Sequence, residues 1–478
     1  MNKNFLSDEI IKVFGYEPTA SQILAIKTIS AFFCDENNYC SFLLTGYAGT
    51  GKTTLISTLV NVLNGLKINT VLLAPTGRAA KVLSSYSSKK ATTIHKCIYR
   101  KKNANNINDS FNLNFNKYKD TIFIIDESSM IENSGTTNSV FGSGKLLDDI
   151  FNFVFSGTNC RIMFVGDPAQ LPPIGTNLSP ALNEKYLNNL DLVVYSSELT
   201  DVVRQSYNSG ILFNATTIRK IITKSTNYKF PKFRLKNFDD IKYINGTDVV
   251  EEIDCCYSKY GIEETKVICK TNKGTNIYNN GIRNRILWRD EEICSGDLLL
   301  VVKNNYTCLP EEAEMDFVAN GDIVEVIKVL RKQEIYEHRY ADLLVRFVDF
   351  PELEITIKVI LDLLTLNTAT MGNDYYKNLY EKIYPDYEEL QNKSKINEAI
   401  FNDVFFNALQ VKFAYSLTCH KSQGGQWKCV FIDHEWLNIE NFSNETKYEF
   451  LRWLYTAVTR ASEKLYLVNF NPIFFEKE

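Results

Sequence analysis

Apolar runs that end in polar or glycine residues recur along the first half of the chain. Residues 41–45, 121–125 and 160–165 read SFLLT, TIFII and CRIMFV, which predicts strands buried on both faces of a parallel sheet. The segment TLISTLVNVLN at 54–64 has helical spacing. Strands that alternate with helices predict an α/β fold, in which ligands bind at the carboxyl ends of the strands.

The second half repeats this pattern around a long insertion. Strands are predicted within Lys266–Lys273 and at Phe413–Thr418, Cys429–Asp433 and Leu465–Val468. Short apolar strands and turns fill the first part of the insertion. Its second part has few Gly or Pro residues and places tyrosines at helical spacing. A tyrosine-rich helix face is more often core than binding surface, so we expect a scaffolding role for this helical part.

Composition restricts the class of protein. With 478 residues, 45% of them hydrophobic, the chain has enough apolar material for several domains. No apolar run approaches the ~18 residues that span a bilayer, and the N-terminus does not resemble a signal peptide, so we expect a cytoplasmic protein. The 11 cysteines form no C-x-x-C pair and are expected to be reduced thiols. A net charge of −4 limits any nucleic-acid site to a local groove.

A complete phosphate-binding loop follows the first strand. Gly46-x-x-x-x-Gly51-Lys52-Thr53 lies between an apolar strand and a helical pattern, which is the setting that this motif requires. The glycines allow backbone N–H groups to point at phosphate oxygens near the positive end of the helix dipole. Lys52 is expected to contact the β- and γ-phosphates of ATP, and Thr53 to bind Mg²⁺.

Two further strand ends carry matching polar groups. Asp126 and Glu127 follow the second strand, where Asp126 would complete the Mg²⁺ shell and Glu127 would orient and deprotonate water. Gln170 lies in the turn after the third strand, where its amide would contact the γ-phosphate or the attacking water. Each group alone is also typical of a solvated strand end or a rigid turn. Their combination with Lys52 favours one ATP site.

The order of these segments resembles superfamily 1 helicases, and within them the RecD/Dda-type group of superfamily 1B. The resemblance covers most of the chain. Its motifs are Gln22 in PTASQILAI, the phosphate loop, Ala74–Ala80, Thr92–Lys96, Asp126–Met130, Gly166–Pro173, Leu199–Gln205, Thr418–Gly424 and Tyr455–Arg460.

This resemblance implies two RecA-like P-loop lobes with insertions in both. The first lobe would comprise residues 1–95 and 121–197, interrupted by a β-hairpin wedge or pin at 96–120. The second lobe would comprise 198–290 and 409–478. Its insertion would consist of an SH3-like β-barrel at 291–359 and a helical, tower-like extension at 360–408.

The resemblance also assigns roles around the nucleotide. Gln22 would read the adenine edge through its amide. Arg204 and Arg460 would reach the γ-phosphate from the second lobe and stabilise charge on the transferring oxygens. The remaining nucleotide-binding positions implied are Gly46, Gly49, Thr50, Gly51, Thr54 and Gly424.

Paired sets of short polar side chains resemble the family's strand-contacting positions. They are Pro75, Thr76, Thr93 and His95 in the first lobe, and Thr418, His420 and Ser422 in the second. Hydroxyl and imidazole donors suit phosphate oxygens and do not read sequence. Each residue alone would as readily be a helix cap or turn residue. Within this resemblance, the HKSQGG segment implies 5′-to-3′ movement, because the 3′-to-5′ branch has a different pattern there, and DESSM is more similar to the DNA-acting than to the RNA-acting members.

The hairpin has two interpretations. Phe111, Leu113 and Phe115 alternate as one face of a strand should, and Phe111 and Phe115 would stack on a terminal base pair at the fork. They would equally form the packed face of an ordinary hairpin.

The sequence therefore predicts an ATP- and Mg²⁺-dependent DNA helicase that moves 5′-to-3′. The alternatives are an ATPase of the same fold that displaces bound proteins without unwinding, and an inactive binding module. The intact ATP-site residues argue against the inactive module. The expected partners are single-stranded and forked duplex DNA, with single-strand-binding or replication proteins; we expect a monomer that does not contact a membrane.

Overall fold

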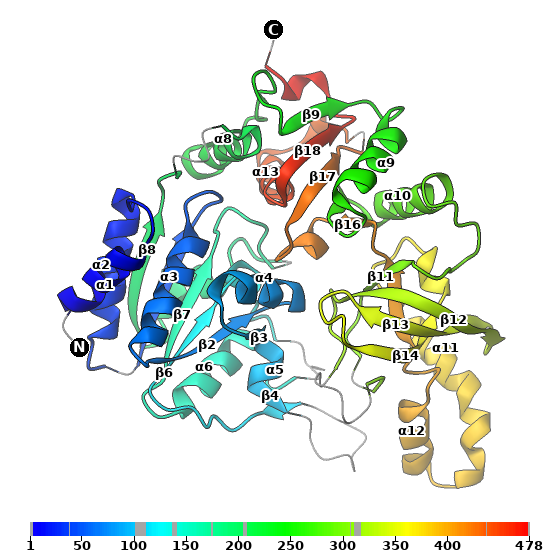
Figure 1. Ribbon diagram of the computed structural model, residues 1–478. Coiled ribbons are helices and arrows are strands. Elements are labelled where there is room, and N and C mark those ends of the chain that lie inside the picture. Colours follow the sequence, from blue (N-terminus) through cyan, green and yellow to red (C-terminus); the bar gives the residue numbers. More distant parts are fainter. Residues whose placement is uncertain are drawn as a thin grey trace.

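A computed structural model gives the arrangement of the chain. It describes residues 3–37, 39–100, 111–135, 141–173, 175–203, 208–305, 307–309, 317–435 and 437–476. Two parallel sheets and a closed barrel form separate layers, with helices on both faces of each sheet (Figure 1). This arrangement confirms the predicted α/β class. Across the described ranges, no helix combines the length and hydrophobicity needed to cross a membrane.

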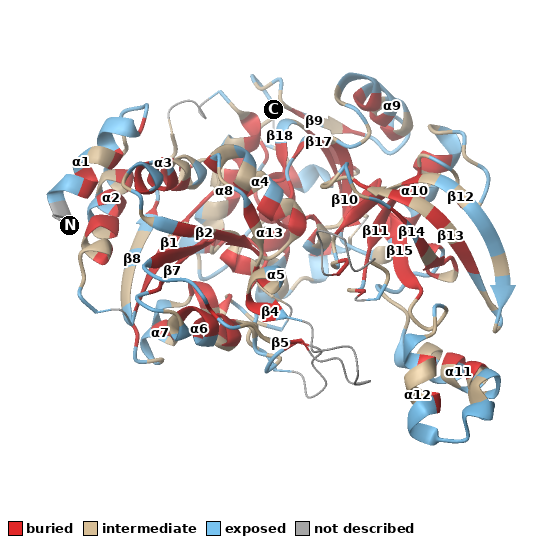
Figure 2. Cartoon of the chain, turned by 60° about the horizontal axis from the view of Figure 1, so that its bottom comes forward, coloured by how far each residue is buried: buried red, intermediate tan, exposed pale blue. Residues whose placement is uncertain are grey.

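The first sheet has six parallel strands in the order β3-β2-β6-β7-β1-β8. The strands are β1 (Cys40–Gly46), β2 (Asn69–Ala74), β3 (Ala91–Thr93), β6 (Thr121–Ile125), β7 (Arg161–Gly166) and β8 (Val193–Leu199). The helices are α1 (Lys3–Val13), α2 (Ala20–Phe33), α3 (Lys52–Gly65), α4 (Gly77–Ser87), α5 (Ile94–Ile98), α6 (Leu146–Ser156) and α7 (Glu184–Asn188). Separate apolar clusters pack against this sheet, and its central strands β1, β2 and β7 are drawn mostly as buried in Figure 2.

The second sheet has five parallel strands in the order β16-β10-β17-β18-β9. The strands are β9 (Ile241–Ile244), β10 (Thr265–Cys269), β16 (Ser416–Thr418), β17 (Trp427–Asp433) and β18 (Ala461–Val468). The helices are α8 (Gly210–Lys224), α9 (Val249–Tyr260), α10 (Asn272–Arg285) and α13 (Asn444–Val458). We call the two sheets with their helices lobe 1 and lobe 2.

The barrel is closed by a strand that we predicted to belong to lobe 2. Its strands are β11 (Leu298–Val301), β12 (Ile323–Ile335), β13 (His338–Phe347), β14 (Glu354–Ile360) and β15 (Leu409–Phe413). The prediction that lobe 2 resumes at residue 409 is wrong, because β15 pairs with β11 and β14. The boundary at 197 is also early, since β8 pairs along β1 as far as Leu199.

Helices α11 (Asn373–Ile383) and α12 (Lys393–Asn402) form the extension that projects from the barrel (Figure 2). Leu379 and Ile383 of α11 are buried against α12, and tyrosines of α11 pack around them. Tyr375 also lies 3.2 Å, oxygen to oxygen, from the hydroxyl of Tyr340 in the barrel. The apolar face of α11 therefore forms a small core of its own.

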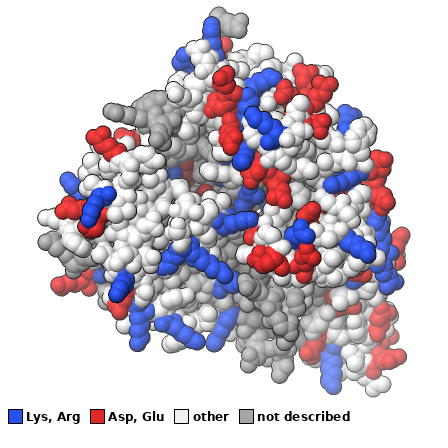
Figure 3. All heavy atoms as spheres, in the orientation of Figure 1, with Lys and Arg blue, Asp and Glu red and all other residues white. Residues whose placement is uncertain are grey.

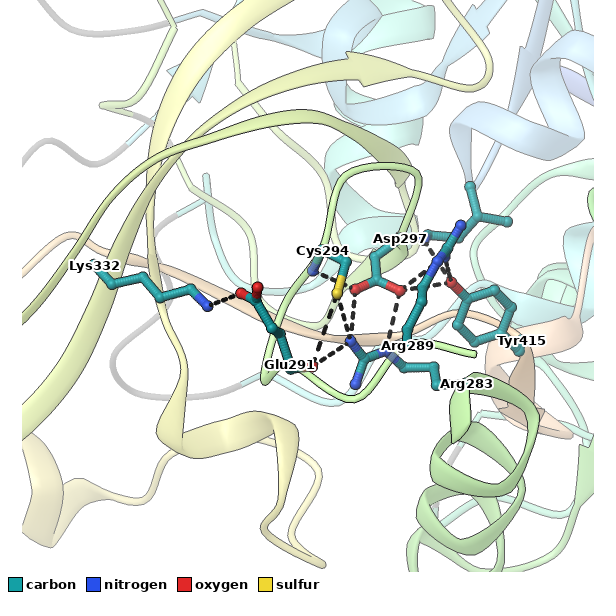
Figure 4. A network of polar contacts seen from close by, with 8 residues as sticks. Arg283, Arg289, Glu291, Cys294, Asp297, Lys332 and Tyr415 are labelled. Carbon is teal, nitrogen blue, oxygen red and sulfur yellow. Dashed lines mark hydrogen bonds and ion pairs between the residues drawn. The ribbon is translucent and has the colours of Figure 1, made fainter. Parts of the chain in front are cut away.

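A buried carboxylate joins the barrel to lobe 2. Asp297, fully buried just before β11, accepts hydrogen bonds from Arg283 of α10 at 3.0 and 2.9 Å (Figure 4). Arg289 donates to it at 2.9 Å, and the hydroxyl of Tyr415 donates at 2.8 Å. Since all these groups come from the segments where barrel and lobe meet, the network fixes the angle between them.

The predicted hairpin begins with a short ladder between β4 (Tyr99–Arg100) and β5 (Asn112–Leu113). Residues 101–110, which would form its tip, lie outside the described residues. Phe111 is 2% exposed and packs against Phe141 and Phe317, with ring centroids 4.9 and 6.2 Å away. Its proposed role of stacking on a base pair is therefore wrong in this arrangement, because its ring is already covered. Phe115 is 70% exposed.

Candidate nucleotide site and strand-binding surface

A cavity of about 570 Å³ lies at the carboxyl ends of β1, β6 and β7, between the two lobes. Residues of both lobes line it. From lobe 1 they include Gly49, Gly51, Lys52, Thr53, Asp126, Glu127 and Gln170, and from lobe 2 Gly424, Gln426, Thr459 and Arg460. Side chains predicted from separate segments thus meet around one space.

The loop between β1 and α3 begins this cavity. Gly49 and Gly51 have φ angles of +74° and +81°, which favour glycine. A Cβ at Gly51 would lie 2.5 Å from the amide nitrogen of Gln22, so a side chain would not fit there. The ammonium of Lys52 donates to the carbonyls of Gly46 and Tyr47 at 2.7 and 3.0 Å. The Lys52 ammonium is therefore held against the backbone of the loop, beside the cavity.

Two carboxylates follow β6 within the cavity wall. Asp126 accepts a hydrogen bond from the hydroxyl of Tyr86 at 2.6 Å and another from the backbone N–H of Glu127 at 2.9 Å. Glu127 adopts a left-handed conformation with φ of 51°. Burial raises the pKa of Glu127, and the nearby Arg460 opposes that shift. A carboxylate with a raised pKa is suited to take a proton from water.

Gln170 and Arg460 face this pair from opposite lobes. The oxygen of the Gln170 side chain is buried and, among the described residues, has no hydrogen-bond donor. Arg460, 2% exposed, donates to the carbonyls of Thr456 and Gly425 at 3.0 Å each and to the Thr459 hydroxyl. Because these partners are uncharged, the guanidinium charge remains available to an anion in the cavity.

Helix α13 contributes contacts by Tyr455 and Arg452, two residues to which we assigned no role from the sequence. The hydroxyl of Tyr455 donates to Asp167 at 2.6 Å and accepts from the N–H of Ala48 at 2.8 Å. Arg452, 3% exposed, donates to the carbonyls of Gln170 and Pro168. The sequence offered two signals, Arg452 within the apolar stretch FLRWLY and the place of Tyr455 at the start of the Tyr455–Arg460 motif. These bonds join lobe 2 to the loops that bear the predicted ATP-site residues.

A second cavity of about 420 Å³ lies beside the loop and is lined by Phe14, Tyr16, Glu17, Pro18, Thr19, Gln22, Thr54 and Val203. Gln22 is 2% exposed and donates to the carbonyl of Thr50 at 3.0 Å. Its oxygen accepts from the N–H of Thr19 at 2.9 Å, so the amide also caps α2. Thr50 is fully buried, with its hydroxyl bonded to Tyr47. Arg204 lies outside the described residues.

The predicted strand-contacting residues surround the start of α4. Thr76 caps α4, Thr93 caps α5, and Pro75 lies half-buried between β2 and α4. Gly424 of lobe 2 closely approaches Thr76, since a Cβ there would lie 3.0 Å from the threonine oxygen. The segment that follows the second set of positions therefore reaches Thr76 of the first set. Capping occupies both threonine oxygens as acceptors but leaves their O–H groups as donors.

The three remaining candidates and His95 differ in access. Ser422 is fully buried and donates to the carbonyl of Cys419 at 2.8 Å, so its prediction as a strand contact is wrong in this arrangement. His420 is exposed and Thr418 half-buried. His95 packs against Tyr99 and Phe141, and burial lowers its pKa to about 4. His95 is therefore neutral at pH 7 and offers a hydrogen bond rather than a charge.

The two sheets and the cavity between them define a two-lobed P-loop nucleotide-binding protein. Residues 34–176 match the family described as AAA domain, and residues 413–468 match the UvrD-like helicase C-terminal domain. The chain is 26% identical to uncharacterized protein R530 of Acanthamoeba polyphaga mimivirus, covering 94% of this chain and 98% of that protein. It is 25% identical to ATP-dependent DNA helicase dda of Enterobacteria phage T4, covering 81% and 86%.

These matches fall on most of the segments that carry the motifs, and they support the resemblance to superfamily 1B helicases of the RecD/Dda-like group. Among solved structures, the Pif1 helicase from Candida albicans is 15% identical with a TM-score of 0.45, and the match covers 96% of each chain.

Proposed function

We propose that this protein is an ATP-dependent DNA helicase that moves 5′-to-3′ along single-stranded DNA and unwinds duplexes. The observation that carries the proposal is the shared cavity, in which Arg460 of lobe 2 faces Lys52, Asp126 and Glu127 of lobe 1. A nucleotide bound there would join the lobes by its charge, and hydrolysis would remove part of that link. Repeated closing and opening would then move the lobes along a strand.

The residues of the cavity suit ATP and Mg²⁺. Lys52 would hold the β- and γ-phosphates, while Thr53 and Asp126 would hold the ion. Mg²⁺ would neutralise charge on the phosphate oxygens. The buried oxygen of Gln170, which has no donor among the described residues, supports the fit, because it needs a donor such as the attacking water. Glu127 would take the proton of that water, and Arg460 would stabilise the charge that develops on the γ-phosphate.

The surface beside the cavity supports DNA as the track. Lysine and arginine side chains gather on the half of lobe 1 that carries α4 and α5, although the whole chain is acidic (Figure 3). Thr76, Thr93 and His95 lie on this same side, and uncharged donors among cations suit phosphates without reading sequence. The relative dda, named as an ATP-dependent DNA helicase, supports the same choice.

The direction of movement is tested by strand displacement. The substrates are forked duplexes that carry only a 5′ or only a 3′ single-stranded tail. We expect unwinding only from the 5′ tail; unwinding only from the 3′ tail would reverse the assigned direction. If ATP turnover is stimulated by single strands but neither fork opens, the alternative of an ATPase that displaces bound proteins would hold instead.

The ATP site is tested by Lys52→Ala. Loss of the fixed cation should abolish ATP turnover, because binding energy at the transferring phosphate is lost. Lys67→Ala, on an exposed turn after α3, is the matched control and should turn over ATP normally. Turnover near the unsubstituted rate in Lys52→Ala would mean that the site is misplaced.

A further inference from the structure

A third cavity lies between lobe 1 and the barrel, separate from the nucleotide cavity. Its volume is about 200 Å³, and it is bounded by α4, β3 and α5 on one side and by barrel loops on the other. Figure 1 shows α4 and β3 facing this end of the barrel. The lining residues are Gly77, Ala80, Lys81, Ser84, Lys90, Ala91, Thr92, Thr93, Lys96, Phe317, Ala319, Asp322, Asp349 and Phe350. Thr93 already belongs to the candidate strand contacts.

The size and the walls of this cavity suit one planar ring. Two phenylalanines, Phe317 and Phe350, line it from the barrel, and Ala80 and Ala91 line it from lobe 1. Whole small-molecule ligands occupy about 300–1,000 Å³, so about 200 Å³ matches a part of a nucleotide rather than all of it. Aromatic side chains are the usual partners of bases in single-stranded nucleic acid.

Asp322 supplies a hydrogen-bond acceptor inside the cavity. One carboxylate oxygen accepts from the N–H of Ala319 at 2.7 Å. The other lies beside the start of α4, where a Cβ at Gly77 would be 3.1 Å away. Asp322 is 5% exposed and, within the described ranges, has no lysine or arginine at ion-pair distance. Burial raises its pKa to about 7. A donor from a ligand would therefore satisfy a carboxylate that lacks a cation.

The charges at this site separate a base from its phosphate. Asp322 and Asp349 would repel a phosphate inside the cavity, whereas Lys90 and Lys96 are exposed at its rim. Lys81 is already 3.5 Å from a carboxylate oxygen of Asp349. This distribution of charge favours a phosphate at the rim of the cavity and an uncharged hydrogen-bond donor of the base within it.

We propose that this cavity holds one base of the bound strand, with Asp322 accepting a hydrogen bond from an exocyclic amino group. The inference rests on the proposed function, since it presupposes that a strand crosses lobe 1. Cytosine presents its N4 amino donor at the position where thymine presents the O4 acceptor. The site therefore prefers cytosine to thymine, whose O4 would face the carboxylate oxygen.

The preference is measured by fluorescence anisotropy with labelled oligo-dC and oligo-dT of equal length at pH 8, where Asp322 is mostly ionised. Oligo-dC is expected to bind about ten-fold more tightly, the size of one good contact between an acid and a base edge. In Asp322→Asn the preference should disappear or reverse, because an amide also donates to the thymine O4. Asp342→Asn, in the barrel but paired with Lys358, is the control and should keep the preference.

A second measurement does not depend on any variant. Oligo-dC with two methyl groups on each N4 nitrogen has no amino donor, and the unsubstituted protein should bind it no more tightly than oligo-dT. Equal binding of oligo-dC and oligo-dT, or an unchanged preference in Asp322→Asn, would overturn the base site while leaving the strand groove intact. If neither oligonucleotide binds, the proposed function itself fails.

Discussion

The hydroxyl of Tyr455 donates a hydrogen bond of 2.6 Å to a carboxylate oxygen of Asp167. The first residue belongs to the last helix of lobe 2, and the second to the loop after β7 in lobe 1. The same hydroxyl accepts from Ala48 in the phosphate-binding loop, so one oxygen links both walls of the ATP cavity to lobe 2.

Removing that oxygen should impair turnover more than nucleotide binding. In Tyr455→Phe the ring remains but Asp167 and Ala48 lose a shared partner, so the lobes no longer hold the cavity in one geometry. We expect kcat for strand-stimulated ATP hydrolysis to fall roughly ten-fold, about 1.4 kcal/mol, with little change in the nucleotide dissociation constant. Tyr257→Phe is the control, because the buried Tyr257 hydroxyl has no partner among the described residues. Equal effects in both variants would contradict a positioning role.

Tyr86 should affect the use of Mg²⁺. Its hydroxyl donates to Asp126 at 2.6 Å, and partners that orient a metal-binding carboxylate typically contribute about 10–100-fold to affinity or activity. Tyr86→Phe is therefore expected to raise the Mg²⁺ concentration for half-maximal ATPase activity roughly ten-fold. Tyr195→Phe is the control, because it removes the same kind of bond, to Asp35 at 2.7 Å, far from the cavity. Its Mg²⁺ dependence should not change. An unchanged Mg²⁺ dependence in Tyr86→Phe would exclude this role.

The two phenylalanines of the hairpin should separate stability from unwinding. Phe111→Ala removes a buried ring, so it should lower the free energy of unfolding by about 3–5 kcal/mol. Phe115→Ala should change that free energy by less than about 0.5 kcal/mol, because the ring is 70% exposed.

Denaturant unfolding measures both values. If Phe115 contacts the fork, Phe115→Ala also slows strand displacement while strand-stimulated ATPase activity stays near normal. A parallel loss of both activities would show that Phe115 acts elsewhere.

The Asp297 network should dominate the stability of the junction between barrel and lobe 2. Asp297→Ala leaves the Arg283 and Arg289 guanidiniums without their shared carboxylate, which typically costs about 3–5 kcal/mol. Glu354→Ala breaks an ion pair with Arg346 in which both side chains are more than 40% exposed, and it should cost about 0–1 kcal/mol. Denaturant unfolding gives the loss in free energy of unfolding for each variant. Similar losses in the two variants would mean that this carboxylate does not hold the junction.

Local pattern predicted β1, β6 and β7 because each is a continuous apolar run that ends at polar or glycine residues, whereas β3 and β8 read ATT and VVYSSEL and carry no such run. Asp126, Glu127 and Gln170 were recognisable for that reason, since the ends of parallel strands share one edge. Contacts made by docking of the lobes had no such signal. Tyr455 and Arg452 lie on a helix whose sequence does not reveal which face meets lobe 1.

The misassigned strand has a similar physical cause. The segment Leu409–Thr418 reads LQVKFAYSLT, and its hydrophobicity does not mark the point at which pairing passes from the barrel to the lobe 2 sheet. Which strands pair depends on contacts between residues far apart in the sequence. One apolar run can therefore supply a strand to the barrel and another to the lobe 2 sheet. Thr76 and Thr93 were ambiguous for another reason. Both cap helices, and a threonine at the start of a helix suits capping and strand binding equally, so the sequence does not distinguish the two roles.

That shared segment has a mechanical consequence. Only Ala414 and Tyr415 separate β15 from β16, and the Tyr415 hydroxyl is bonded to Asp297. A joint this short and this well anchored resists bending, so the barrel should turn with lobe 2 as a lever arm. A small rotation at the ATP cavity would then become a larger sweep at the far end of the barrel, where α11 and α12 project.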